Sequence, residues 1–181
     1  SWGGDAEVRT LKAAQWQGGH VMPTGEALIS GGYLNELLMR LLARDDPHAS
    51  LFDHYALAVQ LLAERGDVQQ LILRAFELLL LQDAGLLPDL ACEGSSLAPL
   101  DEDLPYVLLP ESGLRPAHGD DVHHLSGAQW SGLQQALNDR DPLIASMRAC
   151  ASCQQALQPQ LRQLLHYHSG VRVFQTRQPV S

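Results

Sequence analysis

The hydrophobic positions of residues 32–63 follow two amphipathic helices joined by a turn, because they recur every three or four residues and so share one buried face. In the first helix these positions are Leu34, Leu37, Leu38, Leu41 and Leu42. Pro47 ends that helix, since proline disfavours helical geometry in the residue before it. The second helix repeats the spacing at Leu51, Phe52, Tyr55, Val59 and Leu62. The pattern predicts helices over residues 25–43 and 48–64.

A third helix is predicted over residues 67–83, where apolar positions become dense. Asp67 is its expected cap, and Gly85 is its expected stop because glycine readily adopts the left-handed geometry that ends helices. Residues 88–125 differ from the rest, since prolines and glycines recur through them. They predict a loop-rich insert with short extended pieces, such as residues 104–109.

Helix signals return after the insert. Ser126 and Gln129 have the spacing of a capping box, which predicts a helix over residues 127–138. Pro142 opens the last helical stretch, because proline is tolerated at a first helical position. Pro159 is expected to kink or split that stretch, since a proline inside a helix removes a backbone hydrogen bond.

Composition narrows the possible functions. The 181 residues carry 21 acidic side chains against 12 of lysine and arginine, for a formal net charge of −9. A nucleic-acid binder normally presents a basic surface, so the overall charge argues against strong DNA binding. Three cysteines form no disulfide framework and fit a reducing cytoplasm. The longest apolar stretch, residues 71–81, is interrupted by Arg74 and Glu77, so no membrane span is expected.

Candidate chemistry is sparse. The chain has no P-loop, nucleophile elbow or HExxH motif, so we expect no enzyme, no catalytic residue and no cofactor. Cys150 and Cys153 form a C-x-x-C. This pattern is either a redox or metal motif, or a pair of small residues buried on a helix. No glycine-rich or βαβ pattern surrounds it, so the sequence favours the buried pair. Residues 118–124 hold three histidines and two aspartates, which form either a metal site or a solvated loop. We expect no metal.

Short motifs in a consistent order resemble the RecO family of bacterial DNA repair proteins. The hairpin reads YLNELL at residues 33–38 and LFD at residues 51–53, and the third helix reads LRAFE at residues 73–77. Weaker matches are Gly3–Leu11, Asp89–Cys92, Leu125–Gln129, Leu157–Pro159 and Thr176–Arg177. Together they cover nearly the whole chain.

The resemblance implies a mainly α fold. Residues 23–181 would form a RecO-like C-terminal helical domain, with the loop and β insert at about 88–125. Residues 1–22 would be a remnant of the family's N-terminal OB-fold domain, with one strand at residues 7–13. An OB barrel has five strands, so most of it is expected to be missing. The insert holds only Cys92, so the four-cysteine zinc site of some family members is not expected.

The resemblance also implies a function. A family member binds and anneals single-stranded DNA and assists RecA loading, together with RecR and single-stranded DNA-binding protein. The implied location is cytoplasmic and nucleoid-associated. Because the barrel carries much of the DNA binding, this acidic chain is expected to bind single strands weakly.

Five residues are candidate contacts. The family's helical domain binds the acidic, apolar C-terminal tail of single-stranded DNA-binding protein, and Arg74 matches the signature arginine of that site. An arginine binds a terminal carboxylate bidentately, so Arg74 would act beside Phe76, with Arg40 as a helper. The alternative for Arg74 is an exposed arginine paired with a glutamate one turn away. Arg172 and Arg177 would contact nucleic-acid phosphates or form a solvated basic tail.

A second class of function stays open. The chain would then be a small helical metal-binding or redox protein that uses Cys92, Cys150, Cys153 and the residues His118–His124.

Overall fold

The computed structural model describes residues 25–42 and 48–169. The elements, in chain order, are α2 (Glu26–Leu41), α3 (Ala49–Glu64), the 3-10 turn η2 (Gly66–Val68), α4 (Gln69–Asp83), β1 (Pro105–Leu109), β2 (Gly113–Pro116), β3 (Leu125–Ser126), α5 (Gly127–Leu137), α6 (Pro142–Cys150) and α7 (Gln154–Ser169). The mainly α fold with a small β insert is therefore confirmed. The expected OB remnant at residues 1–22, its strand, Arg172 and Arg177 all lie outside the described residues.

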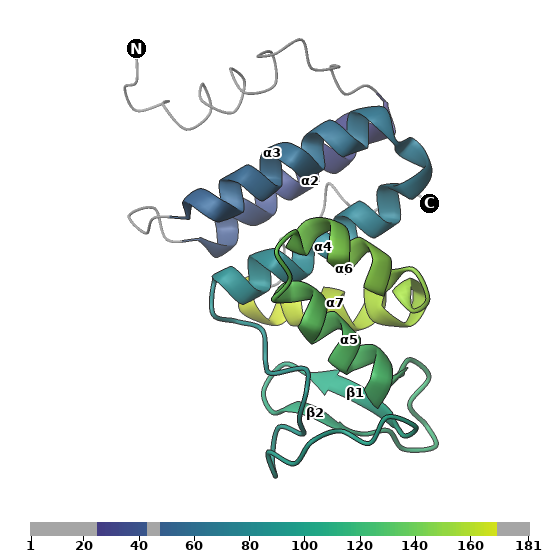
Figure 1. Cartoon of the computed structure of the whole chain (residues 1–181). Helices are drawn as coiled ribbons and strands as arrows, with labels where there is room; N and C mark the ends of the chain where they lie inside the picture. The colour runs from purple at the N-terminus through teal and green to yellow at the C-terminus, as the bar shows by residue number, and fades with distance from the viewer. Residues whose placement is uncertain (1–24, 43–47, 170–181) are drawn as a thin grey trace.

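Helix α4 lies at the centre of the molecule (Figure 1). The α2–α3 hairpin packs on one side of it, α6 and α7 pack on the other, and the small sheet lies at the end opposite the hairpin (Figure 1). Every residue from Ile72 to Leu81 is buried. A helix covered on all sides is hydrophobic all round, and the polar residues of this stretch are Arg74 and Glu77.

The hairpin buries most of the face that its periodicity predicts. Leu34, Leu37 and Leu38 on α2 are buried, and α3 buries the predicted positions with one exception. Phe52 is 44% exposed, so its assignment to the core was wrong. Leu51 and Phe52 are adjacent and therefore point about 100° apart on a helix, and Leu51 takes the inward direction.

Two predicted helix ends are confirmed. Gly85 has a φ of 76°, and the N–H of Leu86 donates to the carbonyl of Leu81 at 2.9 Å, which is the bond pattern of a glycine-stopped helix. The Ser126 hydroxyl accepts from the N–H of Gln129 at 3.1 Å. The Gln129 side chain accepts from the N–H of Ser126 at 3.0 Å, which completes the capping box before α5.

Two other boundaries differ from the prediction. Asp67 does not cap α4, because it lies in η2 and pairs with Arg65, and α4 begins at Gln69 without a side-chain cap. The last helical stretch is split at residues 151–153, and Pro159 lies inside α7. The split predicted at Pro159 therefore occurs six residues earlier, at the turn that ends with Cys153.

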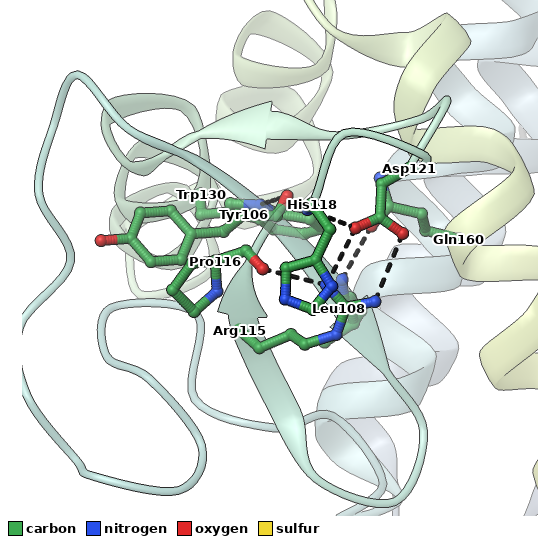
Figure 2. Close-up of polar contacts among 8 residues, drawn as sticks. All are labelled: Tyr106, Leu108, Arg115, Pro116, His118, Asp121, Trp130 and Gln160. Atoms are coloured by element: carbon green, nitrogen blue, oxygen red, sulfur yellow. Dashed lines mark hydrogen bonds and ion pairs between the residues drawn. The ribbon is translucent and has the colours of Figure 1, made fainter.

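The insert forms a three-stranded antiparallel sheet in the order β2-β1-β3. Strand β3 covers only the start of β1, so the rest of that edge needs other partners. Two helices contact this edge, α5 at Tyr106, which also pairs with β3, and α7 beyond the end of β3 (Figure 2). The Trp130 Nε1–H on α5 donates to the carbonyl of Tyr106 at 3.1 Å. The Gln160 side-chain oxygen on α7 accepts from the N–H of Leu108 at 2.8 Å, while its Nε2 donates to the carbonyl of Ala156 at 2.9 Å.

Replacing Gln160 with leucine is expected to lower the free energy of unfolding by about 1–3 kcal/mol, because the buried N–H of Leu108 loses its partner. Urea unfolding followed by circular dichroism measures this. Gln155→Leu is the matched control, since Gln155 is exposed on the same helix. Equal losses from the two substitutions would contradict the role of Gln160 as the link between α7 and the sheet.

None of the helices within residues 25–42 and 48–169 is long and apolar enough to cross a membrane.

Candidate functional site

Arg74 lies in a buried polar cluster between α2 and α4. Its Nε lies 2.7 Å from one carboxylate oxygen of Glu77, and its Nη2 donates to the other at 2.9 Å. The Tyr33 hydroxyl on α2 donates to that second oxygen at 2.5 Å. The side chains of Arg74 and Glu77 are 1% and 2% exposed. The i, i+3 pairing of Arg74 with Glu77 that the sequence suggested is confirmed, but the accessibility expected of Arg74 was wrong.

The two other residues expected to bind a peptide tail lie in different surroundings. Phe76 is fully buried and meets the Tyr55 ring edge-on, with ring centroids 6.0 Å apart. Burial raises the pKa of Tyr55 to about 12. Arg40 is 48% exposed and lies 3.7 Å from Glu36 one turn earlier. Of Arg74, Phe76 and Arg40, only Arg40 therefore has a solvent-accessible side chain. Binding of a peptide tail by these residues stays a prediction.

The cysteines are poor nucleophiles. Cys150 and Cys153 are buried near the end of α6, whereas Cys92 lies in the insert. Burial raises the pKa of Cys150 well above its usual value, and Cys153 beside it raises it further. Burial also raises the pKa of Cys153 to about 11. Thiolates are the reactive form of cysteine, so this C-x-x-C suits packing better than redox chemistry.

The histidine-rich loop after β2 is organised by an ion pair (Figure 2). Arg115 donates to both oxygens of Asp121, at 2.9 and 3.3 Å. The N–H of His118 donates to the Oδ2 of Asp121 at 2.6 Å. The hydrogen bond from Arg115, and then that from His118, lower the pKa of Asp121 to about 2.

One group in the described part of the chain has the spacing of metal ligands. His118, Asp120 and Asp121 offer ligand atoms within 4.8 Å of one another. Asp121 already holds Arg115 with both oxygens, and no cysteine belongs to the group. The described residues therefore do not combine the cysteines and histidines into the metal or redox centre of the second hypothesis.

Comparisons with known proteins agree with the fold. The family model described as "Recombination protein O C terminal" matches residues 22–172. The fold and this match show that residues 22–172 form the C-terminal domain type of a recombination protein family. DNA repair protein RecO of Polaromonas naphthalenivorans (strain CJ2) is 62% identical over 179 residues, which span 98% of this chain and 72% of that protein. The RecO of Albidiferax ferrireducens is 58% identical over 98% of this chain and 71% of its own. The chain belongs to the RecO family of DNA repair proteins.

Sequence reasoning missed two partners. The sequence marks Tyr33 only as part of a family motif, yet its hydroxyl completes the Arg74–Glu77 cluster. No sequence pattern points to Arg115, although it holds the loop whose histidines and aspartates suggest a metal site. A hydroxyl on the apolar face of α2 was the available signal for Tyr33, because buried tyrosine hydroxyls usually find a hydrogen-bond partner.

Proposed function

We propose that this chain serves as a recombination mediator, which binds and anneals single-stranded DNA and assists RecA loading with RecR and single-stranded DNA-binding protein. The observation that carries the proposal is the family match over residues 22–172, together with close relatives named as DNA repair proteins. We propose a cytoplasmic, nucleoid-associated location, where such substrates occur. The proposed mechanism uses binding energy alone, without catalytic groups or a cofactor.

The helical scaffold supports a role in holding partners. Its core runs continuously from the α2–α3 hairpin to the insert, because α4 contacts α2, α3, α6 and α7. Surfaces on opposite ends of the molecule are therefore held in fixed relation, which suits a protein that brings DNA and protein partners together.

We also propose that the acidic tail of single-stranded DNA-binding protein docks on the helical domain. Among the candidate residues Arg74, Phe76 and Arg40, only Arg40 has a solvent-accessible positive charge. That charge complements an acidic peptide, which supports Arg40 as the docking contact. Arg74 and Phe76 would support the surface from the core. We expect Arg172 and Arg177 to add phosphate contacts.

The test is annealing of complementary strands that are coated with single-stranded DNA-binding protein. Adding the chain is expected to accelerate annealing, and RecR binding is measured in parallel by sedimentation. Annealing and RecR binding are measured separately, so either result can be obtained without the other. Failure of both arms would refute the proposal.

A further inference from the structure

The insert holds two loops against its small sheet. Residues 84–104 lead from α4 into β1, and residues 117–124 lead from β2 into β3. In RecO members with a four-cysteine zinc site in this insert, the metal would join the segments that supply its ligands, because a structural zinc ion binds all of them at once. A chain whose residues do not fit zinc needs another linkage.

The donor groups of this chain do not fit such a zinc ion. A closed structural site needs four thiolate or imidazole ligands, and Cys92 is the only cysteine within residues 88–125. Burial and the neighbouring Asp89 carboxylate raise the pKa of the Cys92 thiol, which disfavours the thiolate that binds metal. Cys150 belongs to α6, where it lies close enough to Arg74 for that charge to act on its pKa.

The loop before β1 is held by the backbone of β2. The N–H of Gly94 donates to the carbonyl of Leu114 at 2.9 Å, and Glu93 forms a parallel bridge with Leu114. The N–H of Glu93 donates to the carbonyl of Ala98 at 2.9 Å, which closes the loop on itself. This approach requires a glycine, since a Cβ on Gly94 would lie 1.6 Å from the carbonyl oxygen of Ser112.

The loop after β2 is held by a side chain of the same strand (Figure 2). Arg115 follows Leu114 in β2, and its guanidinium donates to both oxygens of Asp121 and to the carbonyl of Pro116. The N–H of Asp121 donates to the carbonyl of His118 at 3.0 Å, and the N–H of His118 donates to the Asp121 carboxylate. The ion pair therefore anchors a turn that is already closed by its own backbone.

We propose that β2 takes the place of a zinc ion in this chain and joins the two loops of the insert, one through Leu114 and the other through the Arg115–Asp121 ion pair. The side chains of this pair are 31% and 21% exposed, so solvent screens it less than a fully exposed pair. A linkage of this kind needs neither metal nor reduced thiols, and it resists the chelators and oxidants that release zinc from thiolates. It goes beyond the proposed function and does not depend on it.

A metal ion on His118, Asp120 and Asp121 is the competing arrangement, because their ligand atoms lie within 4.8 Å of one another. The ion would have to share Asp121 with the Arg115 guanidinium, a cation that already contacts both carboxylate oxygens. The two arrangements differ in their response to a chelator.

The first measurement is the zinc content and the melting temperature of the full chain, before and after treatment with EDTA. We expect substoichiometric zinc and an unchanged melting temperature. One bound zinc ion per chain, whose removal lowers the melting temperature, would overturn the proposal and favour the competing arrangement.

Hydrogen–deuterium exchange tests the link to the second loop. Arg115→Met should raise the exchange rate of the His118 amide by about 10-fold or more, because the carboxylate that accepts its N–H loses its anchor. Arg65→Met is the matched control, since Arg65 also donates to both oxygens of one aspartate, Asp67, but at an exposed position and between near neighbours. Exchange at residues 117–124 that is the same in both variants would remove the ion pair from the linkage.

The glycine contact is tested in the same way. Gly94→Ala should raise the exchange rate of residues 93–98 by about 10-fold or more, because the loop has to leave β2 to admit the methyl group. Gly132→Ala on α5 is the control, since nothing lies within 4 Å of the added Cβ. Equal exchange at residues 93–98 in the two variants would overturn the first link. Should Gly94→Ala not fold, Arg115→Met decides alone.

Discussion

Replacing Glu77 with alanine is expected to lower the free energy of unfolding by about 3–5 kcal/mol. The substitution leaves the Arg74 guanidinium, which is 1% exposed, without the carboxylate that both its Nε and Nη2 contact. The Tyr33 hydroxyl loses its acceptor at the same time. Domains of this size are stable by about 5–15 kcal/mol, so a substantial share of the total would be lost. Urea unfolding followed by circular dichroism gives the difference directly.

Two comparisons isolate the cause of this loss. Glu64→Ala removes a glutamate from an exposed position on α3, and its effect should be within about 0.5 kcal/mol of zero. The double substitution of Arg74→Met with Glu77→Leu should restore much of the stability, because buried ion pairs are often replaced by hydrophobic residues at little cost. If Glu77→Ala proved as mild as Glu64→Ala, the cluster would contribute little to the fold.

The cluster gives the LRAFE motif a structural meaning. Leu73, Arg74, Phe76 and Glu77 are all buried, so the four residues that match the family signature are core residues of α4. Arg74 and Glu77 neutralise each other, and Tyr33 ties the pair to α2. The motif therefore fixes the hairpin against the central helix, whatever contacts it makes with partners.

The sequence predicted best those features that depend on neighbouring residues. The glycine stop at Gly85 and the capping box of Ser126 and Gln129 are local, and both are confirmed. The burial of Arg74 was not predictable in this way. Its carboxylate partner is one turn away, but the hydroxyl that completes the cluster comes from Tyr33, which lies 44 residues from Glu77. Periodicity marks one apolar face, whereas α4 is enclosed on every side.

In the insert, too, a local feature was predicted and the contacts between distant residues were not. The extended stretch at residues 104–109 was predicted, and β1 lies within it. The residues that anchor the strand were not predicted, because Gln160 lies 52 residues from Leu108 and belongs to another helix. A glutamine on a helix carries no signal that its amide will complete a distant strand edge. The pairing of Arg115 with Asp121 was not predictable either, because it depends on the turn between them.

Phe76→Ala is expected to lower the free energy of unfolding by about 3–5 kcal/mol, because it opens a cavity in the core where the ring meets Tyr55. Phe52→Ala is the matched control, since Phe52 is 44% exposed on α3 and its loss should change stability by about 0.5 kcal/mol or less. Thermal and urea unfolding of both variants provide the measurement. Equal losses would contradict the assignment of Phe76 to the core.

The same pair of variants separates a core role from a direct peptide contact. If Phe76 touched the tail of single-stranded DNA-binding protein directly, its replacement would weaken peptide binding and leave the free energy of unfolding nearly unchanged. Phe76 is buried, so its replacement should instead lower the free energy of unfolding. Peptide affinity should then fall only under conditions in which the variant unfolds. Arg40→Ala completes the comparison, because Arg40 is exposed and its loss should weaken an acidic peptide without affecting unfolding. Opposite behaviour of Phe76→Ala and Arg40→Ala in the two assays would place the docking contact on the surface of α2 and leave Phe76 to the core beneath it.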